Sequence, residues 1–273
     1  MKLGFTTLGC PKWDLDAVCR RAKEYGFDGF DFRGLQDSLD ITVLPAFNGE
    51  LEATAKRIPD TGLEVSGVSS SISICDLARR DANIEEARRT IPVAIGLGAR
   101  HVRVFGGGDP SKTPRADLVK AGADCMKAIL ALDGARRVKW VLETHDSWIA
   151  SEHYLMLLNK LPKKAVGALW DMAHSPCYAG ESPDHAMAAF GSRIAYTHIK
   201  DAVRVENPSD AHHAWRYVTP GTGEVPLKES IGLLKKAGYD GWLVFEHEKR
   251  WVPDLAEPED VFPKFVAWAR QFA

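Results

Sequence analysis

The feature that most constrains the fold of this chain is an alternation of short apolar runs with longer amphipathic stretches, repeated eight times in 273 residues. Apolar runs of strand length that alternate with stretches of helix length indicate repeated strand–helix units and a parallel sheet. Eight such units joined by right-handed crossovers close into a barrel of about 250 residues. We therefore predict an α/β fold in which residues 1–273 form a single (β/α)8 barrel domain. The runs lie at residues 3–8, 26–33, 63–70, 99–106, 139–146, 165–173, 193–201 and 241–248.

The spacing of apolar residues predicts where the helices lie. After the first run, Leu15, Val18 and Ala22 recur at intervals of three and four residues, which places them on one face of a helix. Asp14 is a suitable N-cap for this helix, and Gly26 is a suitable C-terminal stop. The same spacing predicts further helices over residues 84–97, 118–132, 227–237 and 257–272.

A doubly wound open sheet is the alternative arrangement of such units. That fold usually carries a G-x-G-x-x-G turn after its first strand, whereas this chain has TTLGCPKW there. Two other glycine-rich segments, residues 106–108 and the loop PGTGEVP at 220–226, could cradle a phosphate through backbone N–H groups. We interpret both as tight turns, because glycine is the usual residue where the backbone bends sharply.

Composition excludes several classes of protein. The 35 basic and 37 acidic side chains give a net charge of −2, without the basic footprint of a nucleic-acid-binding protein. The chain has no apolar run long enough to span a membrane, and its amino terminus lacks the apolar core of a secretory signal. Five widely spaced cysteines with no C-x-x-C pair argue against disulfides and structural zinc. We expect a cytoplasmic protein with a small-molecule partner.

Polar residues with metal-binding side chains stand at the carboxyl ends of four predicted strands. They are Glu143, Asp171, His198 and Glu246. Active sites of (β/α)8 barrels lie at this end of the strands, and residues two apart on a strand share a face. If these faces point inward, three carboxylates and an imidazole converge, and a divalent cation would offset the cost of burying their charge. This oxygen-rich set favours Mn²⁺, with Mg²⁺, Co²⁺, Fe²⁺ and Zn²⁺ as alternatives.

Other polar residues lie near the same strand ends. His145, Lys200 and Glu248 share the inward faces, where they either contact substrate and set specificity or support the metal ligands. Asp201 has the opposite parity to His198, so we expect it to support the neighbouring loop.

The ends of the first, second and eighth strands carry four further candidates. Asp31 and Arg33 follow the second run, and we favour a mutual ion pair over contact with substrate. Trp13 and Trp251 follow the first and eighth runs. They either form an apolar wall of the pocket or pack at the rim of the barrel.

Motif order connects these residues to a known family. The motifs are a glutamate at 143, D-x-x-H at 171–174, H-x-K-D at 198–201, the loop PGTGEVP at 220–226 and a glutamate at 246. This order resembles the xylose-isomerase-like TIM barrels of the sugar phosphate isomerase/epimerase family, which includes the ketose 3-epimerases. The resemblance covers essentially the whole chain, and by it Glu143, Asp171, His198 and Glu246 are the metal ligands. It also implies that His174 and Arg204 hold the substrate.

The resemblance implies a metal-dependent isomerase or epimerase of a sugar or sugar phosphate, active in carbohydrate metabolism. Such a reaction removes a proton α to a carbonyl and forms an enediolate, for which the metal supplies Lewis acidity. Glu143 and Glu246 are then the catalytic base and acid. Three alternatives stay open: a dehydratase of a keto-polyol or dehydroshikimate, a non-catalytic barrel that binds sugar or metal, and, least favoured, an apurinic-site endonuclease. The sequence also leaves open a homo-oligomer.

Overall fold

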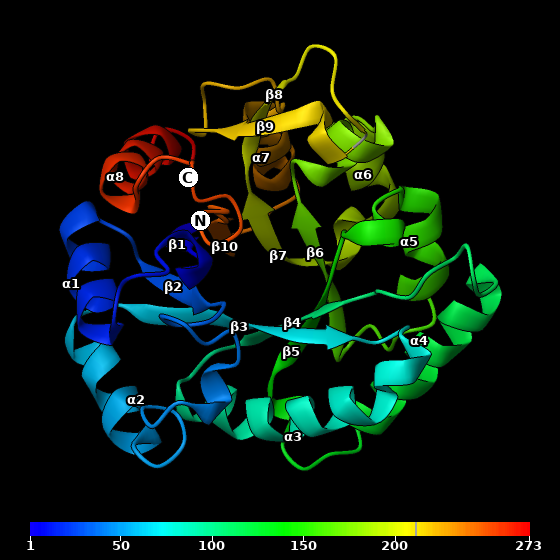
Figure 1. The fold of residues 1–273 in the computed structure, drawn as a ribbon, viewed down its shortest axis with the longest axis horizontal. Helices are drawn as coiled ribbons and strands as arrows, with labels where there is room; N and C mark the ends of the chain where they lie inside the picture. Colours follow the sequence, from blue (N-terminus) through cyan, green and yellow to red (C-terminus); the bar gives the residue numbers. More distant parts are fainter. Residues whose placement is uncertain (211) are drawn as a thin grey trace.

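Eight parallel strands form a nearly closed barrel in the computed structural model, which describes residues 1–210 and 212–273 (Figure 1). Their order is β1-β10-β7-β6-β5-β4-β3-β2, and a parallel bridge between Thr6 and Asp31 joins the two ends of this order. The predicted (β/α)8 barrel is therefore confirmed. The strands are Lys2–Phe5 (β1), Gly29–Phe32 (β2), Glu64–Ser73 (β3), His101–Phe105 (β4), Lys139–Glu143 (β5), Val166–Asp171 (β6), Ile194–Ile199 (β7) and Trp242–Phe245 (β10).

The α-helices lie around the outside of the strands (Figure 1). They are Leu15–Tyr25 (α1), Leu51–Asp60 (α2), Arg80–Gly96 (α3), Arg115–Ile129 (α4), Ser151–Leu158 (α5), Pro183–Phe190 (α6), Leu227–Lys236 (α7) and Pro258–Ala269 (α8). Short helical turns are Thr7–Gly9 (η1), Ile41–Val43 (η2), Leu77–Arg79 (η3), Ala135–Arg137 (η4), Asp146–Trp148 (η5), Ser175–Ala179 (η6), Gly191–Arg193 (η7) and His212–Ala214 (η8). Among the described residues, no helix combines the length and the apolar character needed to cross a bilayer.

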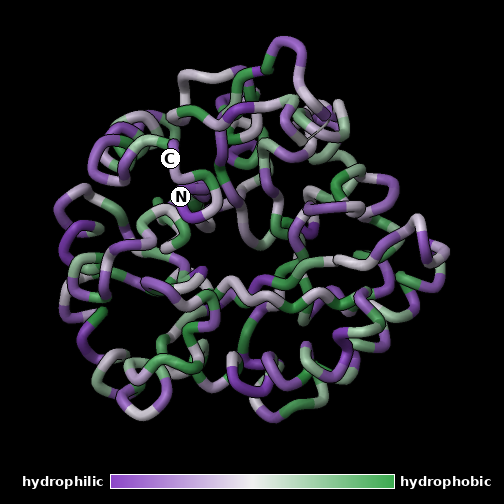
Figure 2. Tube along the Cα trace, in the orientation of Figure 1, coloured by the Kyte–Doolittle hydropathy of each residue, from purple (hydrophilic) through white to green (hydrophobic). Residues whose placement is uncertain are grey.

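Helix α1 forms where the apolar spacing predicts it. The Asp14 side chain accepts a hydrogen bond from the backbone N–H of Ala17 at 2.8 Å, and Gly26 ends the helix with φ +84°. Val18 and Ala22 are buried against the sheet. Hydrophobic and hydrophilic residues alternate along the helices around the barrel, as expected for elements with one buried face (Figure 2).

A small apolar cluster fills the inside of the barrel. Val141, Leu169, Tyr196 and Val244 pack together there, away from the larger core between sheet and helices. Each of them stands two residues before the candidate metal ligand of its own strand. Since side chains two apart share a face of a strand, the candidate ligands point into the barrel, one layer above this apolar floor.

A β-hairpin follows β7 and was not predicted from the sequence. Asp201–Arg204 (β8) pairs antiparallel with Trp215–Val218 (β9), so the predicted run at 193–201 is split between two strands. The Trp215 indole N–H donates to the carbonyl of Cys177 at 2.7 Å, which ties the hairpin to η6. The long connection between β8 and β9 lacks the short glycine-containing turn that identifies a hairpin in sequence.

The 220–226 loop contains a turn, as predicted, whereas residues 106–108 form an irregular segment in which Gly107 and Gly108 have φ +66° and +76°. A Cβ atom on Gly106 would lie 2.1 Å from Cδ1 of Trp148, so only glycine fits beside this ring. In the 220–226 loop, Gly221 has φ +90°, and the backbone N–H groups of Gly221 and Gly223 donate to Asp201 Oδ2 at 2.8 Å each. A carboxylate of the chain itself thus occupies the donors that a phosphate would need.

Candidate metal centre

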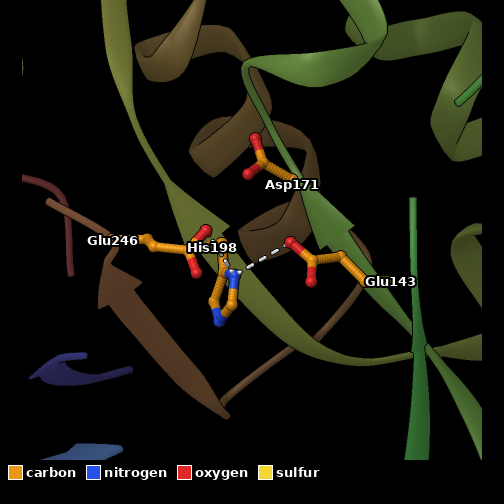
Figure 3. Close-up of side chains that lie close together, drawn as sticks. All are labelled: Glu143, Asp171, His198 and Glu246. Atoms are coloured by element: carbon orange, nitrogen blue, oxygen red, sulfur yellow. Dashed lines mark hydrogen bonds and ion pairs between the residues drawn. The ribbon is translucent and has the colours of Figure 1, made fainter. Parts of the chain in front are cut away.

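The four predicted metal ligands come together at the carboxyl end of the barrel (Figure 3). Glu143 and Asp171 are the last residues of β5 and β6, His198 lies in β7, and Glu246 directly follows β10. All four are buried, and each offers one ligand atom within 4.8 Å of those of the others. The parallel register of neighbouring strands brings about this arrangement, because it aligns their carboxyl ends at one level.

The imidazole of His198 lies between two carboxylates. Its Nδ1 atom is 3.3 Å from Glu143 Oε1 and 3.0 Å from Glu246 Oε2. Burial opposes the charged imidazolium, but the carboxylates of Glu246 and Glu143 outweigh burial and raise the pKa of His198 to about 10. The other ring nitrogen, Nε2, is buried without a hydrogen-bond partner among the described residues.

Arg103, on β4, forms a buried ion pair with Glu143 that was not predicted from the sequence. The guanidinium Nη1 lies 2.6 Å from Glu143 Oε2, and Nη2 donates to the carbonyl of Ser70 at 3.1 Å. Burial would raise the pKa of Glu143, but the charge of Arg103 outweighs it and lowers the pKa below the ordinary range. The signal that could have indicated this role is an arginine in the middle of an otherwise apolar run.

Lys200 lies among three carboxylates. Its ammonium nitrogen is 2.9 Å from Asp171 Oδ2, 2.7 Å from Glu246 Oε2 and 2.8 Å from Glu248 Oε1. Burial disfavours the ammonium form, but Asp171, Glu246 and Glu248 together raise the pKa of Lys200 well above its ordinary value. Against the effect of burial, the charges of His198 and Lys200 lower the pKa of Glu246. Both partners are therefore ionised at neutral pH.

The donor set of this cluster fits one divalent cation. Three carboxylates and one imidazole are hard ligands of the kind that Mn²⁺, Mg²⁺ and related ions take in proteins. Two atoms of the set, His198 Nε2 and Asp171 Oδ2, are buried without a well-directed hydrogen bond, although the Lys200 ammonium lies near the latter. Buried polar atoms without partners are uncommon in folded proteins, and a cation bound among the four side chains would give Asp171 Oδ2 a partner.

His174 contacts the same cluster in its neutral form. Its Nδ1 donates to the carbonyl of Thr144 at 2.8 Å, so the lone pair is on Nε2, which lies 3.4 Å from the Lys200 ammonium and 3.5 Å from Asp171 Oδ2. Burial lowers the pKa of His174 and keeps the ring uncharged. Its predicted role in substrate binding remains a prediction.

A cavity of about 520 Å³ opens beside His174. The ring of His145 lies 5.1 Å from that of His174, and its Nδ1 is 2.8 Å from Asp146 Oδ1. Burial opposes protonation of His145, but Asp146 outweighs it and raises the pKa. The cavity adjoins the metal ligands through His174 and is large enough for a small organic molecule. Its lining includes Arg115, His145, His153, His174, Tyr178 and Tyr217, and Tyr217 lies on the unpredicted hairpin.

The structure separates Arg204 from this cavity. Arg204 lies on β8 with an exposed side chain, and its backbone N–H donates to Glu224 Oε1 at 3.0 Å. It does not belong to the cavity lining within the described chain. Asp201 is buried and accepts hydrogen bonds from the 220–226 loop, which confirms the expectation that it supports this loop.

The expected ion pair between Asp31 and Arg33 is wrong. Asp31 Oδ2 instead accepts a hydrogen bond from the Tyr196 hydroxyl at 2.9 Å, because Tyr196 reaches across the barrel from β7. The Arg33 guanidinium donates to the Ser71 hydroxyl at 2.9 Å.

The two rim tryptophans differ in exposure. Trp13 is buried, donates to Glu259 and packs edge-on against Phe262 at 5.7 Å, so it belongs to the rim of the barrel. Trp251 is largely exposed.

Curated proteins resemble part of this chain. An inosose dehydratase of Geobacillus thermodenitrificans is 32% identical over 125 residues, which cover 42% of this chain and 40% of that protein. The matched segment thus spans about two fifths of the relative's length. The dehydratase activity of that relative bears on this chain only as support for a proposal.

Solved structures share the whole fold at low identity. A D-psicose 3-epimerase, solved in the presence of D-fructose, superposes with a TM-score of 0.76 at 15% identity, covering 100% of this chain and 99% of the other. The IolI protein with a bound zinc atom has a TM-score of 0.77 at 17% identity, covering 100% and 96%. A family model, described as xylose isomerase-like TIM barrel, matches residues 19–272. The chain therefore belongs to the xylose isomerase-like TIM barrel family.

Proposed function

We propose that this protein is a divalent-metal-dependent isomerase or epimerase of a sugar or sugar phosphate, acting through removal of a proton α to a carbonyl. The observation that carries the proposal is the pair Glu143 and Glu246, whose oxygens lie 3.3 Å and 3.0 Å from one imidazole nitrogen of His198. Two carboxylates from separate strands thus border one small volume. A bound cation supplies Lewis acidity to the oxygens of a hydroxyketone.

The chain itself supplies the proton transfer. Without a bound ion, Arg103 keeps Glu143 ionised, and His198 and Lys200 do the same for Glu246. When His198 is neutral and binds metal, Lys200 and the cation would keep Glu246 ionised, so each carboxylate is available as a base at neutral pH. An isomerisation needs one of them to move a proton between neighbouring carbons, whereas an epimerisation needs both, one on each face of the substrate. The Lys200 ammonium would offset the negative charge that develops on the enediolate oxygen.

The metal that we propose is Mn²⁺. An oxygen-rich set with a single imidazole favours a harder ion than the thiolate sites of structural zinc. Zinc in the IolI protein makes Zn²⁺ the first alternative to test. Elemental analysis of the purified protein, followed by removal of metal with a chelator and addition of single ions, decides among them. Protein that binds none of these ions would contradict the proposed site.

A dehydratase is the second candidate, and the inosose dehydratase relative favours it. This reaction begins with the same proton abstraction but then expels a neighbouring hydroxyl group. Lys200, 2.7 Å from Glu246 Oε2, would be the acid that protonates the leaving oxygen. Its substrate would be a keto-polyol or a related cyclic ketone, and its product an enone.

One experiment separates the candidates. The metal-loaded protein is incubated in deuterated water with a panel of ketoses, ketose phosphates and keto-polyols, and the products are followed by NMR and by enone absorbance. Deuterium at the α-carbon of an isomer or epimer supports the first candidate, and an absorbing product that lacks one water supports the second. Binding of a panel member without deuterium exchange would contradict both and would favour a non-catalytic barrel.

A further inference from the structure

Arg33 is a nearly buried cation without a carboxylate partner. It directly follows β2, and 8% of its surface is exposed. Arg103, Lys200 and Lys249 are the other buried lysines and arginines of the described chain, and each forms an ion pair with at least one carboxylate. Within residues 1–210 and 212–273, Arg33 forms none. Its one side-chain hydrogen bond goes to the Ser71 hydroxyl at 2.9 Å.

An unpaired buried guanidinium is unfavourable for the folded protein. A buried charge needs an opposite charge or several hydrogen bonds to offset its lost hydration. Burial, together with the nearby positive charge of Arg103, lowers the pKa of Arg33 to about 10. Residues whose local arrangement costs stability are concentrated at functional sites. Glu246, Glu86 and Glu143 raise the pKa of Arg33 in part, but none of them is within ion-pair distance of the guanidinium in the described structure. Arg33 therefore has no directly bound anion among the described residues.

The backbone holds Arg33 on the inward face at the mouth of the barrel. Asp31, two residues earlier, points inward to Tyr196, so Arg33 shares its face one layer closer to the carboxyl end. The Arg33 backbone N–H donates to Thr7 Oγ1 at 2.9 Å, and Gly34 then turns the chain with φ +79°. Arg33 thus stands at the same end of the barrel as the candidate metal ligands.

Ser71 completes a small group of donors beside Arg33. Its hydroxyl oxygen accepts the bond from Arg33, which leaves the hydroxyl hydrogen free to donate to a ligand. Its backbone N–H is already taken by Glu86 Oε1 at 2.6 Å, and Glu86 is not within ion-pair distance of the guanidinium in the described structure. The remaining guanidinium donors and the Ser71 hydroxyl hydrogen therefore have no hydrogen-bond partner among the described residues.

We propose that Arg33 and the Ser71 hydroxyl bind an anionic group of the substrate, a carboxylate or a phosphate, while the hydroxyketone end lies at Glu143, Asp171, His198 and Glu246. This inference rests on the proposed function and narrows its substrate class to acidic sugars or sugar phosphates. A neutral ketose leaves the guanidinium without its partner. Because charge-assisted hydrogen bonds are the stronger ones, we expect the anionic substrate to be preferred by about 10- to 100-fold in kcat/KM.

The first test measures anion binding without turnover. Metal-free protein is titrated calorimetrically with inorganic phosphate and, separately, with acetate, in the wild type and in Arg33→Gln. The matched control is Arg115→Gln, because Arg115 is a half-buried arginine of the neighbouring cavity that also lacks an ion pair in the described chain. We expect Arg33→Gln to weaken binding of one or both anions at least about 10-fold and Arg115→Gln to leave it unchanged.

The anion whose binding is weakened by Arg33→Gln identifies the charged group of the substrate. Weaker binding of phosphate indicates a phosphorylated substrate, and weaker binding of acetate alone indicates a sugar acid. Equal binding by the wild type and Arg33→Gln would overturn the proposal. So would loss of binding in Arg115→Gln alone, since the anion would then occupy the other cavity.

The second test uses turnover. Solvent deuterium exchange is compared for D-fructose, D-fructose 6-phosphate and D-fructuronate, with Arg33→Lys as the conservative variant. We expect Arg33→Gln to raise KM for a charged ketose with little change in kcat, Arg33→Lys to restore part of the loss, and D-fructose to be unaffected. An equal effect of Arg33→Gln on charged and neutral ketoses would refute the anion site but leave the proposed function standing. Absence of exchange with all ketoses would count against the proposed function, and the titrations would still decide the anion site.

The melting temperature Tm of Arg33→Gln distinguishes an arginine that binds a ligand from one that only supports the fold. Since the wild-type guanidinium has no ion-pair partner among the described residues, Arg33→Gln should leave Tm unchanged or raise it, and the glutamine can keep the hydrogen bond to Ser71. A clear fall in Tm would mean that Arg33 supports the fold instead of binding a ligand.

Discussion

The ammonium of Lys200 lies 2.7 Å from Glu246 Oε2, inside the group of carboxylates that we propose as a metal site. Together with a protonated His198 and the guanidinium of Arg103, it gives this acidic cluster three internal cations. The metal-free protein can therefore keep these carboxylates ionised and buried. A divalent cation would take over this role from the proton on His198, since an imidazole binds metal only in its neutral form.

The stability of the metal-free protein should depend on pH through this cluster. His198 has a folded pKa of about 10, above its ordinary 6.5, so its stabilisation is complete below about pH 6.5 and is lost as pH rises toward 10. Glu143 and Glu246 have lowered pKa values, so their stabilisation is present above about pH 4.5 and is lost as pH falls. We expect Tm of the metal-free protein to be highest between these limits.

The stabilisation of the protein by bound metal should depend on pH in the opposite sense to the stabilisation by protonated His198. Because His198 must release its proton to bind an ion, the increase in Tm caused by Mn²⁺ should grow as pH rises from about 6 to 8. Thermal unfolding with and without Mn²⁺ measures this difference, and the His198→Asn variant should lack it. An increase in Tm that shrinks over the same range would contradict the assignment of His198 as a ligand.

Replacement of Glu246 by glutamine should abolish exchange of the substrate α-proton while leaving the barrel folded. The loss should be about 10²- to 10⁴-fold, the usual contribution of a positioned acid–base group. Glu248→Gln is the matched control, because Glu248 also contacts Lys200 at 2.8 Å but is not one of the four candidate ligands. Exchange at the wild-type rate in Glu246→Gln, or an equal loss in both variants, would show that Glu246 has no special role.

Arg103→Met should destabilise the metal-free protein by about 3–5 kcal/mol, because it leaves the buried Glu143 carboxylate without its partner. Urea unfolding measures the change. The double variant Arg103→Met, Glu143→Gln removes the charge as well and should lose less than the sum of the two single changes. Additive losses would mean that the packing of Arg103 on Phe105, with the guanidinium carbon 3.8 Å from the ring centroid, matters more than the ion pair.

Asp201→Ala should loosen the 220–226 loop and cost about 1–3 kcal/mol, because the backbone N–H groups of Gly221, Gly223 and Val225 lose their acceptor. Hydrogen exchange of this segment should accelerate, while affinity for Mn²⁺ stays within about threefold of wild type, a change worth less than 1 kcal/mol. Asp201→Asn keeps one carbonyl oxygen and should show a smaller effect. Loss of metal affinity with an unchanged loop would instead assign Asp201 to the metal site.

Local regularities of the sequence made the barrel and the four candidate ligands predictable. A strand has a side-chain period of two, so Val141, Leu169 and Val244 could be assigned to the same face as the ligand two positions later. That this face points inward was a condition of the prediction, and the structure meets it. Helix α1 was equally local, since its cap Asp14 and its stop Gly26 act within one turn of the helix. Such features need no knowledge of distant contacts.

Contacts between distant segments were not predictable in this way. The ion pair between Arg103 and Glu143 joins residues 40 apart in sequence, and the bond from Tyr196 to Asp31 joins residues 165 apart. The latter leaves Arg33 without the partner expected from its neighbour in sequence. The β8–β9 hairpin likewise depends on pairing across a long connection.

The sequence by itself determined the periodicities, and through them the strands, the barrel and the identity of the residues at the carboxyl ends of the strands. Only the tertiary structure decided which charges are paired, that Lys200 lies among carboxylates and that Arg204 is exposed outside the cavity. It also decided that Arg33 is buried with no ion-pair partner among the described residues. The physical reason is that side-chain period is a property of a few consecutive residues. Electrostatic pairing depends on distances across the closed barrel, which exist only after all strands have assembled.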